Sequence, residues 1–84
     1  MVTESLRMLP SADELHYQAS RLRADADLME GYAQQLLATA SELSACPTAP
    51  EWSRPTLELQ AAACSTAAKQ LRTAAEALLA HSRA

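Results

Sequence analysis

The sequence of 84 residues contains no Ile and no Phe, and Val2 is its only Val. β-Sheets are built largely from β-branched and aromatic residues, so this shortage argues against all-β and α/β folds. The most abundant residues are Ala, with 19 copies, and Leu, with 13. Both residues favour helices. The composition therefore predicts an all-α protein.

Glycine and histidine are also scarce, with one Gly and two His in the chain. A single Gly cannot build a phosphate-binding loop, and no Ser, Cys and His are spaced as nucleophile and base. Asp13 and His16 stand one helical turn apart, a spacing that suits two metal ligands, but no third ligand shares that helical face. We therefore expect no enzymatic activity, no cofactor and no metal site.

Strong charge and long apolar runs are missing as well. The formal net charge is −3, whereas nucleic-acid-binding domains usually carry a basic patch. No stretch approaches the about 20 apolar residues of a membrane-spanning helix. The opening MVTESLRMLP has no apolar core of a signal peptide. We expect a cytoplasmic protein that binds another protein, with any export following a route that needs no signal peptide.

We expect a single helical-hairpin domain over residues 1–84, in which the prolines mark the ends of the helices. A lead-in ends at Pro10, and residues 47–55 contain three of the four prolines. We predict helices over residues 11–46 and 54–82, joined by a loop at residues 47–53. Ser11 and Glu14 form a capping-box pattern at the first helix. We predict Ser53 as the N-cap of the second helix. Trp52 either packs on Leu57 as a hydrophobic staple or faces a partner or receptor.

Both predicted helices carry long and small residues at seven-residue intervals. Two helices joined by a short loop run antiparallel, and matching these rows makes the numbers of facing residues add up to about 100. Small residues in every other layer let the two backbones approach below the usual ~8–10 Å. The predicted hairpin seam contains Leu15, Ala19, Leu22, Ala26, Met29, Ala33, Leu36, Ala40 and Leu43 in the first helix, and Leu57, Ala61, Cys64, Ala68, Leu71, Ala75 and Leu78 in the second.

This register separates the two cysteines. Cys46 and Cys64 are expected about 15 Å apart along the hairpin, whereas a disulfide needs Cα atoms within about 7 Å. We therefore predict no intrachain disulfide, with Cys64 in the core and Cys46 at a helix end. Asp25, Asp27 and Glu30 are interpreted as a solvated face, with Arg21 and Asp25 paired one turn apart.

Apolar residues outside the seam indicate that the hairpin has a partner. A two-helix domain rarely gathers enough core alone, and a second hairpin would complete a dimeric four-helix bundle. An alternative interpretation is that exposed Ala simply favours helix and requires no partner. The predicted partner face contains Leu28, Tyr32, Leu37, Leu59, Ala63, Ala67, Ala74 and Leu79.

The loop and the hairpin pattern together resemble a known family. The loop reads Trp52, Ser53, Arg54, Pro55, and the chain opens with Leu6-Arg7-Met8 and Pro10 before the repeated Leu and Ala. This pattern is similar to the WXG superfamily, the ESAT-like small type VII secretion substrates of actinobacteria and firmicutes. Many actinobacterial members read W-S-G-P-A in the loop. Trp52, Ser53 and Pro55 match that form, and Arg54 replaces the Gly of the signature tripeptide.

The resemblance implies a non-enzymatic hairpin that forms a homodimeric or heterodimeric four-helix bundle and leaves the cell folded. In that family, export is associated with the loop Trp of one hairpin beside a Tyr-x-x-x-Asp/Glu tail on its partner. Here Tyr17 is followed four residues later by Arg21, and Tyr32 by Leu36. The resemblance therefore implies a partner or chaperone complex in which another hairpin, or the N-terminal domain of a larger effector, carries the tail. The residues alone leave open a cytosolic homodimeric adaptor unrelated to secretion.

Overall fold

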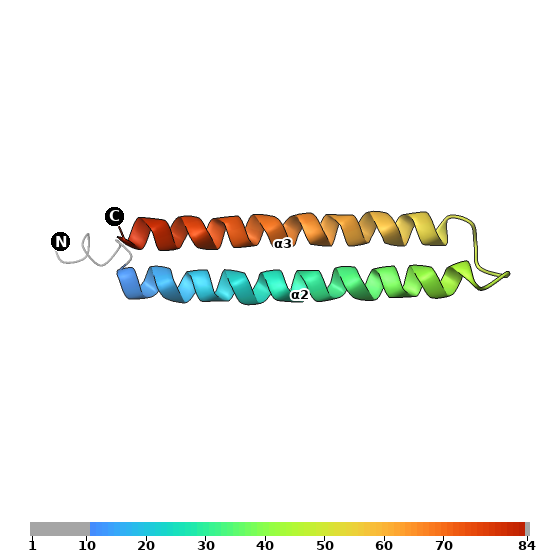
Figure 1. Cartoon of the computed structure of the whole chain (residues 1–84), viewed down its shortest axis with the longest axis horizontal. Coiled ribbons are helices and arrows are strands. Elements are labelled where there is room, and N and C mark those ends of the chain that lie inside the picture. The colour runs from blue at the N-terminus through green and yellow to red at the C-terminus, as the bar shows by residue number, and fades with distance from the viewer. Residues whose placement is uncertain (1–10, 84) are drawn as a thin grey trace, which may run out of the picture.

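The computed structural model describes residues 11–83 and confirms an all-α hairpin. Helix α2 spans Ala12–Ser44 and helix α3 spans Ser53–Arg83. The two helices lie side by side and antiparallel, with the connecting loop at one end of the hairpin (Figure 1). The lead-in at residues 1–10, with the Leu6-Arg7-Met8 and Pro10 of the family pattern, lies outside the described residues.

Helix α2 begins where its capping residues predict. Ser11 has an extended backbone, with φ −78° and ψ 166°, and its hydroxyl accepts a hydrogen bond from the Glu14 amide at 3.1 Å. This bond satisfies one of the amides that the first helical turn leaves unpaired. Asp13 and Glu14 place negative charge at the positive end of the helix dipole. The predicted N-cap at Ser11 is confirmed.

Helix α2 ends at Ser44, two residues earlier than predicted, because of Pro47. A continuing helix would need the amide of residue 47 to donate to the Leu43 carbonyl, and proline has no N–H. The Cys46 amide donates to that carbonyl instead, at 3.0 Å. The Ala45 amide likewise donates to the Glu42 carbonyl at 3.2 Å, so the last turn tightens and the helix stops.

Helix α3 begins one residue earlier than predicted, which makes the prediction for Ser53 wrong. The Thr56 amide donates to the Trp52 carbonyl at 3.1 Å, so Trp52 occupies the capping position and Ser53 is the first helical residue. Pro55 then lies in the first turn, where its missing N–H removes no hydrogen bond. Since a hydrophobic staple needs the residue before the cap, Trp52 is also out of place for it, and its side chain is 68% exposed.

The core of the hairpin is a seam of alanines. The Ala row of each helix is between 0% and 3% exposed, as predicted, and comprises Ala19, Ala26, Ala33 and Ala40 in α2 and Ala61, Ala68 and Ala75 in α3. The row of long residues differs from the prediction. Only Leu15 is buried, at 9% exposure, and the other long seam residues are half-buried. Long side chains do not fit between closely packed backbones, so they lie beside the seam.

Polar contacts across the seam confirm the predicted register. His16 of α2 hydrogen-bonds to Ser82 of α3 at 3.0 Å, and Arg72 of α3 bonds to Asp27 of α2 at 2.9 Å. In both pairs the residue numbers add up to nearly 100. Cys46 and Cys64 are both free thiols, so the prediction of no intrachain disulfide is also confirmed. Cys64 is half-buried beside the seam, and Cys46 lies in the loop, two residues beyond α2.

Candidate functional site

The most distinctive surface of the hairpin is a double row of long apolar side chains along one side of the alanine seam, here called the leucine flank. All of its members are half-buried, because they have packing partners on the seam side only. Among the described residues no large side chain is fully buried. The leucine flank consists of Leu22, Met29, Leu36 and Leu43 from α2 and Leu57, Cys64, Leu71 and Leu78 from α3.

A depression of about 440 Å³ lies in the middle of the leucine flank. It joins the two helices, since its lining combines one residue of α3 with five of α2: Met29, Tyr32, Gln35, Leu36, Thr39 and Cys64. Carboxylates, ammonium groups and guanidinium groups are absent from this lining. A depression with this lining suits a large apolar side chain from another helix.

Helix α3 carries no carboxylate, ammonium or guanidinium group on the leucine-flank side between Pro55 and Ser82. Its charged residues in this range are Glu58, Lys69, Arg72 and Glu76. Glu58 and Arg72 are separated by two seven-residue intervals, and Lys69 and Glu76 by one, so they form two adjacent columns on the far side of the seam. The two α3 columns beside the leucines instead contain Thr56, Gln60, Ala63, Ala67, Gln70, Ala74, Ala77 and His81.

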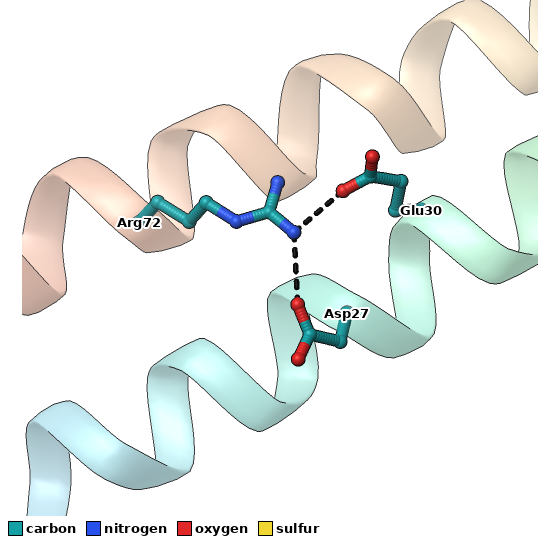
Figure 2. Close-up of polar contacts among 3 residues, drawn as sticks. All are labelled: Asp27, Glu30 and Arg72. Carbon is teal, nitrogen blue, oxygen red and sulfur yellow. Dashed lines mark hydrogen bonds and ion pairs between the residues drawn. The ribbon is translucent and has the colours of Figure 1, made fainter.

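The opposite side of the seam, here called the polar flank, is closed by an ion pair that bridges the helices. The Arg72 guanidinium reaches from α3 to α2 and lies between two carboxylates (Figure 2). Its Nη2 donates to Oδ1 of Asp27 at 2.9 Å and to Oε2 of Glu30. The hydrogen bonds to Asp27 and then Glu30 raise the pKa of Arg72, so the guanidinium stays charged at any physiological pH.

A second bridge lies on the polar flank at the open end of the hairpin. The Ser82 hydroxyl donates to the Leu79 carbonyl at 2.8 Å, so its oxygen is free to accept a hydrogen bond from Nε2–H of His16 at 3.0 Å. This bond places His16 beside the C-terminal end of α3, where the two ends of an antiparallel hairpin meet. In these two bridges, Arg72 and His16 on the polar flank bind residues of the opposite helix.

Asp25, Asp27 and Glu30 are all exposed, as the interpretation of a solvated face predicted, but two of the three also bind a residue of the other helix. Asp27 and Glu30 bind Arg72, and within residues 11–83 no ion pair joins Arg21 to Asp25. The predicted register already indicated the contacts of Arg72 with Asp27 and Glu30. If facing numbers add up to about 100, Arg72 lies opposite residue 28, between the two carboxylates.

The eight residues of the predicted partner face do not form one surface. Leu28 is seven residues from Gln35 and four from Tyr32, both of which line the depression, and Ala63, Ala67 and Ala74 also border the leucine flank. Leu37 is seven residues from Glu30, and Leu79 is seven from Arg72, so these two lie on the polar flank. Leu59 is 74% exposed in a column that faces away from the seam.

The loop between the helices presents its aromatic residue to solvent. Trp52 is 68% exposed, whereas the next residue, Ser53, is only 7% exposed. The Nε of Arg54 lies 3.8 Å from Oε1 of Glu58, one turn along α3. Pro55 completes the motif in the first turn of the helix. Within the motif, Trp52, Arg54 and Pro55 are thus exposed, and only Ser53 is buried.

Cys46 lies at the same end of the hairpin. Its Sγ is 3.2 Å from the Thr48 hydroxyl, and this hydrogen bond, with a weaker backbone one from Thr48, lowers the pKa of the Cys46 thiol. The thiol borders a depression of about 270 Å³ between the end of α2 and the start of α3. Cys46 is therefore accessible and more easily ionised than an ordinary cysteine.

Removing the Arg72 bridge should weaken the hairpin only slightly. We expect Arg72→Met to lower the free energy of unfolding only slightly, since the ion pair is exposed and screened by solvent. Denaturant unfolding at low and high salt measures this difference. The gap between wild type and Arg72→Met should shrink at high salt, and a gap independent of salt would contradict an ionic contribution.

Residues 11–83 contain no group of three or more His, Cys, Asp or Glu side chains arranged to hold a metal ion. Neither α2 nor α3 is apolar enough over a sufficient length to cross a membrane. In comparisons with known proteins, no family model, no curated protein and no solved structure matches the chain.

Proposed function

We propose that this protein is a non-enzymatic helical hairpin that acts in type VII secretion, as a substrate or as a targeting partner. In this role it pairs through its leucine flank with another helical hairpin or with the hairpin-like N-terminal domain of a larger secreted protein. The observation that carries the proposal is the Trp52-Ser53-Arg54-Pro55 loop, with its Trp side chain 68% exposed at the turn of the hairpin.

An exposed Trp needs a reason outside the hairpin. Trp52 contributes little to the core, because the helix begins one residue too early for the ring to act as a staple. Trp is among the residues most enriched at binding hot spots, where its large apolar area is buried by a partner. An export receptor that reads the loop of a folded hairpin would bury this ring.

The leucine flank supports the pairing part of the proposal. Its side chains are half-buried, and the depression around Leu36 and Cys64 is open on the outer side. Covering a half-exposed row of leucines removes apolar surface from water, which stabilises the complex by about 25 cal/mol for each Å² of apolar surface buried. A second hairpin supplies a complementary row of similar length.

An export assay with two matched variants tests the proposed function. In an actinobacterial host with a type VII system, Trp52→Ala should abolish secretion of the tagged protein, while its melting temperature changes by only a few degrees. Leu59→Ala is the control, because Leu59 is similarly exposed, at 74%, but lies on α3 outside the loop. Secretion of Trp52→Ala at the wild-type level would contradict the proposal.

One observation favours a second candidate function, a homodimeric adaptor that stays in the cytosol. The α3 side of the leucine flank is almost free of charge, so no charge repulsion on this side opposes the binding of a second copy of the same chain. Absence of both the wild-type protein and the Trp52→Ala variant from the culture medium of a secreting host would support the adaptor.

A further inference from the structure

We propose that Cys46 is a modification site, where the thiol forms a mixed disulfide with a small amino-acid-derived thiol such as glutathione. The small thiol occupies the depression of about 270 Å³ between the end of α2 and the start of α3, here called the loop depression. This site does not depend on the proposed function, because it requires neither a partner hairpin nor Trp52.

The observation that points to a ligand in the loop depression is the hydroxyl of Ser53. Ser53 lines the depression and is only 7% exposed. Its hydroxyl forms no hydrogen bond within residues 11–83, where every fully shielded side-chain N or O atom of a buried residue has a partner. The Ser53 oxygen therefore reaches solvent through the depression. A largely buried hydroxyl without a protein partner can bind a polar group of a ligand.

The groups around Ser53 suit a ligand that carries both charges. The Arg54 amide lies in the first turn of α3 and has no backbone partner among the described residues, so it can donate to an anion. Arg54 and Glu51 both line the depression and add one guanidinium and one carboxylate. Arg54 contacts Glu58 through Nε at 3.8 Å, which leaves its terminal nitrogens available. An amino-acid-derived ligand, with its carboxylate and its ammonium group, would find an oppositely charged partner for each.

The size of the loop depression favours a small molecule over a protein segment. Small-molecule pockets in proteins usually have volumes of about 300–1,000 Å³, and this depression lies just below that range. A docking helix needs a groove that runs along several of its turns. The loop depression is confined to one end of the hairpin, where α2 ends and α3 begins, so it suits a ligand about as large as an amino acid or a short peptide.

Cys46 supplies the sulfur that can hold such a ligand covalently. It is exposed and lines the same depression, and its Sγ lies 3.2 Å from the Thr48 hydroxyl. The hydrogen bond from Thr48 lowers the pKa of the Cys46 thiol, which increases the share of thiolate. The thiolate is the form that attacks a disulfide. Cys64 is half-buried on the leucine flank and is therefore less accessible to a disulfide in solution.

The reaction is a thiol–disulfide exchange, and its co-reactant is the disulfide form of the small thiol. The Cys46 thiolate attacks one sulfur of this disulfide, so a new S–S bond forms to Sγ while the original S–S bond breaks. The electron pair of the broken bond leaves on the second sulfur as a small thiolate. Cys46 is thereby oxidised and the departing sulfur is reduced, so no further oxidant is needed.

Mass spectrometry of the intact, full-length chain tests which sulfur reacts. The reduced protein is mixed with excess glutathione disulfide at neutral pH, and the rate at which one glutathione is added is measured in the Cys64→Ala and Cys46→Ala variants. We expect Cys64→Ala, which keeps Cys46, to react at least about tenfold faster than Cys46→Ala. Adding Thr48→Val to Cys64→Ala should slow the reaction by at least about threefold, because the hydrogen bond that stabilises the thiolate is lost.

A second disulfide separates a binding site from a merely accessible thiol. Hydroxyethyl disulfide is uncharged, so the ratio of the rate constants for glutathione disulfide and hydroxyethyl disulfide measures recognition of the charged groups. In the Cys64→Ala background, Ser53→Ala and Arg54→Gln should each lower this ratio by at least about threefold, whereas Ser53→Thr, which keeps a hydroxyl, should stay within about twofold. Ser41→Ala is the control, because Ser41 is exposed on α2 and does not line the depression.

Faster addition to Cys46, together with a ratio that falls in Ser53→Ala and Arg54→Gln, supports the inference. Equal or faster reaction of Cys64 overturns it, and so does a ratio that neither substitution changes, since Cys46 would then be an accessible thiol without a binding site. A disulfide-linked pair of chains as the main product overturns it as well, because the second thiol would belong to a protein. None of these results alters the expected effect of Trp52→Ala on export, so the proposed function is tested separately.

Discussion

Replacing Ala33 with Leu should destabilise the hairpin by about 1–3 kcal/mol, because the alanine seam has no room for a longer side chain. Ala33 is 3% exposed, and in the predicted register Ala68, at 2%, lies opposite it. A Leu at this position would push the backbones apart and separate every neighbouring layer of the seam. Urea unfolding followed by circular dichroism measures the change.

Ala38→Leu is the matched control for this prediction. Ala38 lies on the same helix but is exposed, so a longer side chain there meets solvent rather than α3. We expect the free energy of unfolding of Ala38→Leu to lie within about 0.5 kcal/mol of wild type. Equal stabilities of the Ala33→Leu and Ala38→Leu variants would mean that the alanines do not form the contact between the helices.

The second large effect concerns the leucine flank and two neighbouring residues. Leu36 lines the depression, whereas Leu37 is 49% exposed and lies on the polar flank. Leu36→Glu should weaken association with the partner hairpin by at least about tenfold, because a carboxylate would replace a side chain whose burial contributes about 1.5–3 kcal/mol. Leu37→Glu should change the affinity by no more than about twofold.

Sedimentation equilibrium of the two variants provides the measurement, with helicity at high concentration as a check on folding. Both substitutions add one negative charge to α2, so the comparison separates position from net charge. Equal loss of association in Leu36→Glu and Leu37→Glu would indicate that the leucine flank is not the binding surface.

The seven-residue repeats predicted the helices, their direction, their register and the buried alanines. They did not predict how deeply the leucines are buried. A heptad pattern treats both rows as core, but alanines such as Ala26 and Ala75, both 0% exposed, bring the backbones too close for long side chains to lie between them. The leucine flank is thus a consequence of the alanine seam.

The helix ends and the polar contacts were harder to predict for physical reasons. The end of α2 depends on which amide replaces the missing N–H of Pro47, and the start of α3 on a hydrogen bond from Thr56 to Trp52. Arg72 and its two partners are separated by 42 and 45 positions in the sequence. The bridge therefore follows from the register of the two helices and not from local spacing. The type VII role and the partner remain predictions.

The dependence of thermal stability on protein concentration tests the central claim most directly. Among the described residues the hairpin fully buries no large side chain, so we expect it to gain much of its stability when the leucine flank is covered. The melting temperature should then rise as the chain is concentrated from 1 to 100 μM, as mass action requires for coupled folding and association. A monomeric chain with the same high melting temperature throughout this range would contradict the account.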